Sequence, residues 1–489
     1  MTVSKDSKYL VAFSRKGKVY NLETESAITD FNYHDNAVSA AVFAPFKKFD
    51  EEPGIYLASA GGNDKNIFIW DALSGKPVRN LVGNGRGVFA VGYNTEENTI
   101  AFGQSNPTEL LDDAPLEKTF NLTNLSLNPE KPNPKSFVRN KNKFMGHAIE
   151  KQSEQRINFG NNGVSVDEMK DGIIRSYSFV NDYNEVVIGS TYSLKRFKPN
   201  GEYLNDYEGH LGETWAISEI DEQDRLLSSN SDQTIKIWNL SSGENLATLF
   251  ITSKNEWVIW TPQGYYEASA GGEKYIGWHI NKGAGSLAEY HDVSAFSKKF
   301  HRRDVVLKML ETGSFDKTSE VLNIKKQDVN KILPPKIEWI SPANNYTTTN
   351  LSNYNLEVSI SSSIDITQVK LFVNGRPLAM GDKLTATGNT TNKKVSYSLK
   401  LSSEDMIGRR GFDVVPDEEE VVSSKEFQIR FFAANSIANG FSEDRTIVYK
   451  PEAKKSHENT NQESGDKREI TKLEAEDKEE LSQSNLYLV

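Results

Sequence analysis

The strongest constraint on this sequence is an internal repeat. Two segments share one order of features: YHDNAVSAAVFAPFKKFDEEPGIYLASAGGNDKNIFIWDALSG at 33–75 and GHLGETWAISEIDEQDRLLSSNSDQTIKIWNLSSG at 209–243. Each has a histidine, a short alternating strand, a second strand ending in small residues, an Asp turn, and a third strand that closes on Trp-Asp or Trp-Asn. Such a repeat indicates a modular β architecture. We predict that each copy forms a four-stranded antiparallel blade.

Four polar or aromatic residues recur at matching places in the two copies and form the predicted structural network of each blade. They are His34, Ser59, Asp64 and Trp70 in the first copy, and His210, Ser228, Asp232 and Trp238 in the second. A carboxylate in a tight turn would anchor the histidine, which would be linked through the serine hydroxyl to the indole N–H, so that buried polar groups satisfy one another. On these residues both copies resemble WD-repeat blades.

Weaker copies fill the rest of the first 282 residues. Strand-like segments lie at 3–30, 88–126 and 173–208, without a Trp-Asp ending. At roughly 40–45 residues per blade, residues 1–282 are expected to form a WD-repeat-like β-propeller of six or seven blades. The first blade lacks an opening strand. Either strand exchange completes it or the natural protein starts upstream, and the second alternative is the one we favour.

The last repeat, NEWVIWTPQGYYEASAGGEKYIGWHIN at 255–281, has lost the polar residues and gained three tryptophans and three tyrosines. A terminal blade must also meet whatever follows it, so aromatic packing can replace the polar network there. We expect a docking surface for residues 284–312 formed by five aromatic side chains: Trp257, Trp260, Tyr265, Tyr266 and Trp278.

The pattern changes after this repeat. Residues 283–334 place Val305, Val306, Met309 and Leu310 at helical spacing, with Gly313 as a C-cap, and predict a helical connector. Residues 335–451 alternate with period two and contain a hairpin around Asn374-Gly375, which predicts an immunoglobulin-like β-sandwich. The fold class is therefore mainly β.

The C-terminal segment 452–489 is predicted to be an acidic linker. Residues 452–484 carry ten acidic and six basic side chains, and the chain ends on the apolar run NLYLV. That run suits either the first strand of a further parallel sheet or a stub resting on a neighbouring surface.

Composition excludes several classes of function. The 489 residues include no cysteine, so thiolate metal sites and cysteine nucleophiles are absent from this sequence. A net charge of −11 argues against nucleic-acid binding, and no apolar run approaches the roughly 20 residues needed to span a membrane. A cytoplasmic location fits best, although the N-terminus is interpreted as incomplete.

Motifs for catalysis, cofactors or metals do not emerge. Neither Ser165 nor Ser442 lies in a nucleophile elbow, and GNGRG at 83–87 misses the dinucleotide spacing. Histidines 279, 291 and 301 lack ligand spacing. We therefore predict no catalytic residue, no cofactor and no metal.

A candidate partner-binding face comes from strand alternation. Trp215 lies five residues after the blade histidine His210, and the equivalent step after GNGRG reaches Phe89. Both are expected at the rim of the propeller, where exposed aromatic rings act as contact anchors. The alternative is burial between neighbouring blades.

The order of these parts carries a second resemblance. The run EWVIWTPQGYYEASAGGEKYIGWHIN, followed by AEYHDVSAFSKKFHRRDVV, resembles the end of the propeller in bacterial WD-repeat proteins that continue into a caspase-like peptidase domain. The resemblance implies that the catalytic His and Cys of such a domain would lie beyond residue 489, with NLYLV as its first strand. It transfers no catalytic residue to this chain.

Together these features predict a non-catalytic sensor and scaffold. The propeller would capture a protein partner, and the full-length protein would bring that partner to a peptidase domain that also contacts this chain. Two alternatives remain open: a stand-alone propeller enzyme that acts through carboxylates, for example on glycans, and a plain structural scaffold.

Overall fold

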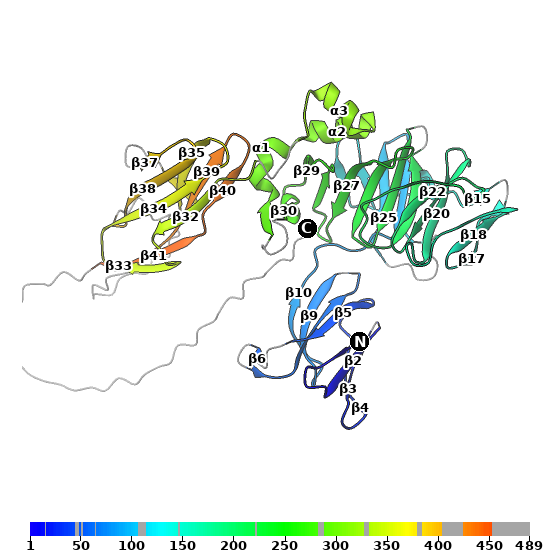
Figure 1. Ribbon diagram of the computed structural model, residues 1–489, viewed down its shortest axis with the longest axis horizontal. Coiled ribbons are helices and arrows are strands. Elements are labelled where there is room, and N and C mark those ends of the chain that lie inside the picture. The colour runs from blue at the N-terminus through cyan, green and yellow to red at the C-terminus, as the bar shows by residue number, and fades with distance from the viewer. Residues whose placement is uncertain are drawn as a thin grey trace, which may run out of the picture. The chain divides into compact units, whose positions relative to one another are not determined.

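The computed structural model describes residues 1–451 apart from 15, 45–47, 50–51, 64, 106–113, 145–146, 221–222, 282–287, 327–331, 379–383 and 403–423. The described residues form two compact units (Figure 1). One consists of 1–279 with 300–326, and the other of 280–299 with 332–451. The predicted boundaries at 282, 334 and 451 stay a prediction.

The first unit is built from antiparallel sheets in chain order. Sheet one holds β1 (Thr2–Val3), β2 (Tyr9–Phe13), β3 (Gly17–Asn21) and β4 (Ser26–Phe31), and sheet two holds β5 (Val38–Phe43), β8 (Tyr56–Gly61), β9 (Asn66–Asp71) and β10 (Pro77–Leu81). The short two-stranded sheet of β6 (Lys48–Phe49) and β7 (Glu52–Pro53) lies between β5 and β8 in the chain. The third sheet holds β11 (Ala90–Asn94), β12 (Thr99–Gly103), β13 (Lys118–Asn121) and β14 (Ser126–Asn128).

Two small sheets follow the third sheet. One pairs β15 (Lys143–Phe144) with β16 (His147–Ala148), and the other holds β17 (Glu150–Ser153), β18 (Arg156–Phe159) and β19 (Asn162–Ser165). The next sheet holds β20 (Ile174–Val180), β21 (Glu185–Ser190), β22 (Leu194–Phe197) and β23 (Tyr203–Asp206). The last runs β24 (Thr214–Ile220), β25 (Arg225–Asn230), β26 (Thr234–Asn239), β27 (Asn245–Ile251), β28 (Trp257–Trp260) and β29 (Tyr266–Ala268).

These sheets stack face to face through apolar side chains. The sheet β24–β29 meets β20–β23 on one face, where Val187, Leu226 and Trp238 pack together, and meets β11–β14 on the other, where Phe102 and Leu249 share one core. The sheet β1–β4 and the sheet of β5, β8, β9 and β10 share a separate core. The last sheet of the repeat region therefore packs on the third sheet of the chain, and the predicted six or seven blades stay a prediction.

Short helices follow the sheets. They are η4 (Val293–Phe296), α1 (Ser297–Phe300), α2 (Arg303–Thr312) and α3 (Phe315–Leu322), preceded by β30 (Gly277–Ile280) and β31 (Glu289–Asp292). Val305, Val306 and Met309 are the buried residues of α2. Gly313 ends this helix with φ = 72°, and its N–H donates to the Met309 carbonyl at 3.0 Å. The predicted helix and its C-cap are both present.

The second unit is a two-sheet sandwich. One sheet has the order β32 (Lys336–Ser341), β34 (Asn353–Ser361), β38 (Asn392–Lys400) and β37 (Leu384–Gly388). The other has the order β33 (Tyr346–Thr349), β41 (Arg445–Tyr449), β39 (Lys425–Asn435), β35 (Ile366–Val373) and β36 (Arg376–Leu378), with β40 (Asn439–Phe441) paired to β39. Alternate residues of both sheets form one apolar core. The predicted hairpin is a two-residue turn with positive φ at Asn374 and Gly375.

Candidate functional site

The polar network of the second full repeat is assembled inside the sheet β24–β29. The His210 Nε2 and Ser228 Oγ atoms are 2.7 Å apart, and the Trp238 Nε1–H donates to the same hydroxyl at 2.7 Å. His210 Nδ1 lies 2.9 Å from the Asp232 carboxylate. Burial lowers the pKa of His210, and the ring is therefore neutral. Burial would raise the pKa of Asp232, but hydrogen bonds, chiefly with His210, hold it at about 2.

The first full repeat contains the same arrangement in part. His34 Nε2 lies 2.9 Å from Ser59 Oγ, and Trp70 Nε1 donates to that hydroxyl at 3.2 Å. The fourth predicted member, Asp64, lies outside the described residues. His34, Ser59 and Trp70 are buried, and so are Ser228 and Trp238 of the second network. The networks therefore order the interior of the blades.

A pocket opens at the end of the sheets where His210 lies. Its volume is ≈ 360 Å³, and it is lined by Lys170, Asp171, Tyr192, Ser193, Leu194, Lys195, Asp206, Tyr207, Glu208, Gly209, His210, Gly212 and Thr214. Inside it the buried Asp171 carboxylate pairs with Lys195 at 2.6 Å. The lining contains three further charged side chains, those of Lys170, Asp206 and Glu208, so the pocket offers charge as well as hydrogen-bonding groups.

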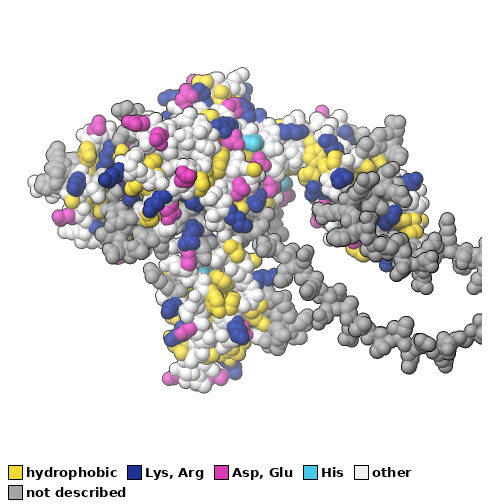
Figure 2. Space-filling model, turned by 180° about the vertical axis from the view of Figure 1, so that it is seen from behind, with side chains coloured by type: hydrophobic (Ala, Val, Ile, Leu, Met, Phe, Trp, Pro, Cys, Tyr) yellow, Lys and Arg dark blue, Asp and Glu magenta, His cyan; other side chains and the backbone are white. Residues whose placement is uncertain are grey.

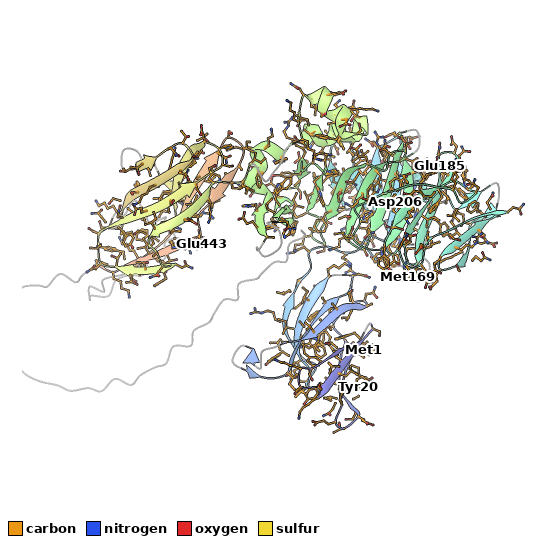
Figure 3. All side chains as sticks on the ribbon, in the orientation of Figure 1. Met1, Tyr20, Met169, Glu185, Asp206 and Glu443 are labelled. Atoms are coloured by element: carbon orange, nitrogen blue, oxygen red, sulfur yellow. The ribbon has the colours of Figure 1, made fainter. Side chains whose placement is uncertain are left out.

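Three exposed apolar side chains come from the loops of this pocket. Met169 is 91% exposed, Leu211 85% and Tyr192 71%. Tyr192 lines the pocket itself, while Met169 and Leu211 each adjoin a lining residue. Met169 lies at the lower edge of the green sheets in Figure 3, and Asp206 lies further into them. We call Met169, Tyr192 and Leu211 the apolar rim.

Of the two alternatives for the candidate anchor Phe89, exposure at the rim and burial between neighbouring blades, the structure has the second. Phe89 is only 3% exposed and packs with Ala90 and Leu116, and Phe137 covers the same cluster. Its ring centroid lies 5.6 Å from that of Trp215, which is half-buried and has the Arg175 guanidinium over its ring. The structure brings the two predicted residues together, but as packing between sheets, because each fills the space beside the other. A free Phe89 ring is not available as an anchor.

The aromatic terminal repeat meets the residues that follow it. Phe300 is fully buried, and its ring centroid lies 5.4 Å from Tyr265 and 5.1 Å from Trp278. Tyr266 stacks on His301 at 5.0 Å. Three of the five predicted docking residues therefore contact the segment 300–301.

The other two predicted docking residues, Trp257 and Trp260, lie at the two ends of β28. Trp257 contacts Phe120 at 5.0 Å and shares a core with Val306 and Met309 of α2. Trp260 lies in β28, where it is paired with Thr248 and Tyr266. Trp257 thus joins sheet and helix.

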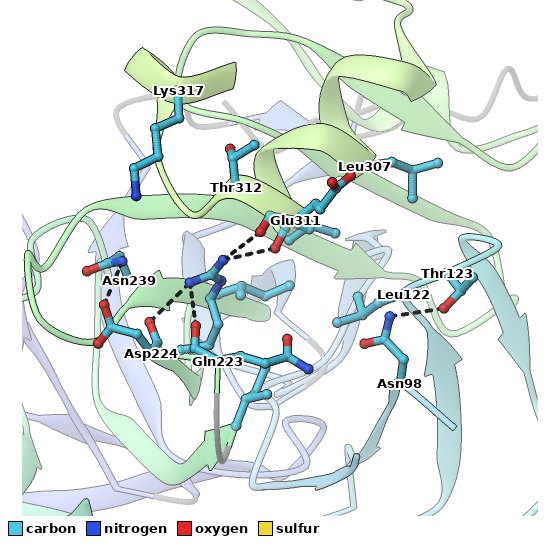
Figure 4. Close-up of a pocket in the computed structure, with 14 residues that line it drawn as sticks. Asn98, Leu122, Thr123, Gln223, Asp224, Asn239, Leu307, Glu311, Thr312 and Lys317 are labelled. Atoms are coloured by element: carbon cyan, nitrogen blue, oxygen red, sulfur yellow. Dashed lines mark hydrogen bonds between the residues drawn. The ribbon is translucent and has the colours of Figure 1, made fainter. Parts of the chain in front are cut away.

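An arginine that sequence patterns did not reveal fastens α2 to the sheet. Arg225 Nη2 donates to the carbonyls of Leu310 and Glu311 at 3.2 Å, and its Nη1 donates to Gln223 at 2.6 Å (Figure 4). These carbonyls belong to the last turn of the helix, where a cation is favourable. A second pocket of ≈ 820 Å³ surrounds this arginine, between α2 and the ends of β12, β13 and β24–β26.

The candidate residues that sequence patterns did not reveal share one property. Arg225 and the members of the apolar rim stand alone in turns or just beyond them, without a repeated spacing. In the sequence, GNGRG at 83–87 occupies the loop where Gly-His stands in the second full repeat, which indicates that the loops differ between copies. Within the described residues, no cluster of three or more histidine and acidic side chains is suited to hold a metal ion. No helix among them is long and apolar enough to cross a membrane.

Comparison with known proteins assigns two parts of the chain. Residues 25–71 and 198–239 match the family described as WD domain, G-beta repeat, and residues 335–407 match the family described as bacterial Ig domain. The chain thus contains WD repeats followed by an Ig-like domain. The predicted fold class is confirmed as mainly β, with WD repeats in four-stranded sheets, a short helical stretch and an Ig-like domain.

Curated relatives cover only a short part of the chain. It is 32% identical over 66 residues to eukaryotic translation initiation factor 3 subunit I of Meyerozyma guilliermondii, or 14% of this chain and 19% of that protein. The protein of the same name from Neurospora crassa is 35% identical over 82 residues, 17% of this chain and 21% of that protein. The chain spans about a fifth of the length of the curated relatives it matches.

Solved structures show distant likenesses. The computationally designed Ika8 protein is 17% identical, with a TM-score of 0.18 over 53% of this chain and 82% of that one. The C-terminal WD40 domain of Sif2 is 12% identical, with a TM-score of 0.20 over 53% and 77%. These scores carry no argument about function. WD repeats themselves indicate a protein-interaction scaffold.

Proposed function

We propose that this chain is a non-catalytic scaffold whose WD-repeat unit captures a protein partner at the apolar rim. The observation that carries the proposal is the exposure of Met169, Tyr192 and Leu211 beside a pocket lined by polar side chains. Apolar anchors next to hydrogen-bonding groups are typical of protein-binding surfaces. The curated relatives are named as subunits of a larger factor, which supports an assembly role for the matched segment.

The finer part of the proposal concerns the full-length protein. The resemblance of residues 255–312 to bacterial WD-repeat proteins with a caspase-like domain suggests that partner capture recruits a substrate to, or restrains, a cysteine peptidase. We place the protein in the bacterial cytoplasm as part of the same proposal. Cell fractionation and the reading frame after the Val489 codon test these points. A frame that encodes a His and Cys peptidase supports the extension, and a stop codon there contradicts it.

The scaffold itself is tested by partner capture with surface variants. Cross-linking in cells that express the full-length gene, followed by mass spectrometry, identifies the partner and the cross-linked residues. Capture of that partner by the purified chain is then compared between the wild type, Leu211→Asp with Tyr192→Ser, and Leu351→Asp. Leu351 is 59% exposed and lies in the Ig-like unit, so it is a matched control. Loss of capture in the rim variant alone supports the proposal, and equal capture by all three contradicts it.

A further inference from the structure

The outer face of one sandwich sheet carries an unusual set of side chains. Along β39, the inward residues Phe427, Ile429 and Phe431 are buried in the core, so the alternating residues Arg430 and Phe432 face outward. The solvent face of an antiparallel sheet is normally polar. Phenylalanine at outward positions therefore needs a reason other than the core of this domain.

Three phenylalanines meet on this outer face. Phe432 pairs directly with Phe441 across β39 and β40, and their ring centroids are 5.1 Å apart. Phe372 of β35 lies 5.8 Å from Phe441 and 6.4 Å from Phe432. Phe441 is 47% exposed, and the other two rings are half-buried. Contact among the rings shields only part of their surface, and the rest faces solvent.

Two cations lie over the same rings. The Arg430 guanidinium is 4.4 Å from the centroid of Phe441 and 5.8 Å from that of Phe372, while Lys370 Nζ is 5.9 Å from Phe432. The register places Arg430 opposite Phe372 and Lys370 opposite Phe432. Neither cation forms an ion pair with a described residue. We call Lys370, Phe372, Arg430, Phe432 and Phe441 the cation–aromatic ladder.

We infer that the cation–aromatic ladder binds an acidic segment of a partner protein that also carries apolar side chains. Arg430 is held in place by two rings, so a carboxylate can bond to it with little further loss of side-chain entropy. The exposed part of Phe441 offers an apolar contact beside that charge. Figure 2 shows hydrophobic side chains next to Lys and Arg side chains on the visible face of this unit. This surface is independent of the apolar rim.

Other occupants fit the ladder less well. A second copy of the chain in a two-fold pair would bring Arg430 and Lys370 against themselves, which repels like charges. Nucleic acid requires a longer basic stripe, and the chain carries a net charge of −11. The acidic residues 452–484 of this chain remain a competitor that the experiment separates.

The test measures binding of a fluorescein-labelled peptide of alternating glutamate and leucine to the full chain by anisotropy. Peptides in which glutamine or lysine replaces glutamate, and a labelled single-stranded oligonucleotide, serve as probes of charge and class. The variants are Arg430→Glu, the milder Arg430→Gln, and Phe441→Ser. Arg376→Glu is the matched control, because Arg376 is exposed on β36 of the same sheet and lies outside the ladder. Circular dichroism checks that each variant is folded.

We expect the acidic peptide to bind the wild type and Arg376→Glu within about twofold of each other, and the ladder variants about tenfold more weakly. Equal affinity in all variants, equal affinity for the glutamine peptide, or preference for the oligonucleotide would overturn the inference. So would binding seen only after residues 452–489 are deleted, which would assign the ladder to the chain's own acidic segment. A wild-type dimer that Arg430→Gln dissociates would assign it to a second copy.

Discussion

The indole N–H of Trp238 donates to the hydroxyl of Ser228 across 2.7 Å, in the buried interior of the sheet β24–β29. The same hydroxyl lies 2.7 Å from His210 Nε2. One small side chain thus joins two large ones on different segments. The network depends on this hydroxyl, because neither Trp238 Nε1 nor His210 Nε2 has another hydrogen-bond partner among the described residues.

Replacing Ser228 with alanine is expected to leave two buried ring nitrogens without a partner. The cost of such groups is about 2 kcal/mol of unfolding free energy for the sheet. Hydrogen exchange followed by mass spectrometry measures this locally, as faster exchange in β25 and β26. Ser39→Ala, at an exposed site in β5, is the control. Unchanged exchange in Ser228→Ala would show that the network is dispensable.

Acid should weaken the same sheet in two steps. The pKa of His210 is lowered by burial, so the unfolded chain binds more protons than the folded one below about pH 6.5. Stability is fully present above that pH and declines as pH falls, by up to about 1.4 kcal/mol per pH unit. The pKa of Asp232 is about 2. Its contribution is therefore lost between about pH 4 and pH 2.

The first step can be assigned with one variant. The stability of β24–β29 is measured by urea unfolding, with hydrogen exchange as the readout, for the wild type and for His210→Gln. The measurements are made near pH 7.5 and near pH 5, which lie about one unit or more on either side of the unperturbed pKa of histidine. We expect a smaller loss of stability on acidification in the variant, because it has no imidazole to protonate. A loss equal to that of the wild type would assign the acid sensitivity to other groups.

The sequence predicted the buried networks because their chemistry depends on spacing within one repeat. Ser228 and Trp238 lie on the neighbouring strands β25 and β26, and His210 lies in the loop just before β24 of the same sheet, so strand length and alternation bring them together. Asp232 follows from the turn between two of those strands. The hairpin at Asn374-Gly375 was predictable for a similar reason, because its backbone needs positive φ at adjacent positions.

Arg225 and Phe89 show what local patterns cannot supply. Arg225 acquires its role only from carbonyls some 85 residues away in the sequence. Phe89 occupies an alternating position, but the sequence does not tell which segment covers it, and the segment around Phe137 does. Both outcomes depend on contacts between distant segments, which periodicity does not encode.

A side chain at Gly313 should be destabilising, because the backbone there has a positive φ and the Arg225 guanidinium occupies the space beside it. Its φ is 72°, and a Cβ there would lie 2.5 Å from the Arg225 guanidinium. Gly313→Ala is expected to cost about 2 kcal/mol or more and to loosen α2 and α3. Hydrogen exchange in residues 303–322 reports the change.

Gly375→Ala is the control for Gly313→Ala, because it separates the effect of backbone strain from the effect of a clash with Arg225. Gly375 has φ = 75°, but nothing lies within 4 Å of its Cβ position. The variant should therefore show only backbone strain, about 1 kcal/mol, as faster exchange in β35 and β36. If Gly313→Ala and Gly375→Ala lower the unfolding free energy by the same amount, backbone strain accounts for both, and disturbing the contact with Arg225 does not loosen the helices.

Phe89 and Leu211 should respond to substitution in opposite ways. Phe89→Ala removes a buried ring and is expected to destabilise the sheets around β11 by about 3 kcal/mol or more. Leu211→Asp changes a side chain that is 85% exposed, so stability should stay within about 0.5 kcal/mol. Thermal unfolding and partner capture are measured on both variants. Reduced capture by Leu211→Asp at unchanged stability would place the partner at the apolar rim, whereas reduced capture by a stable Phe89→Ala would return the binding site to the originally predicted face.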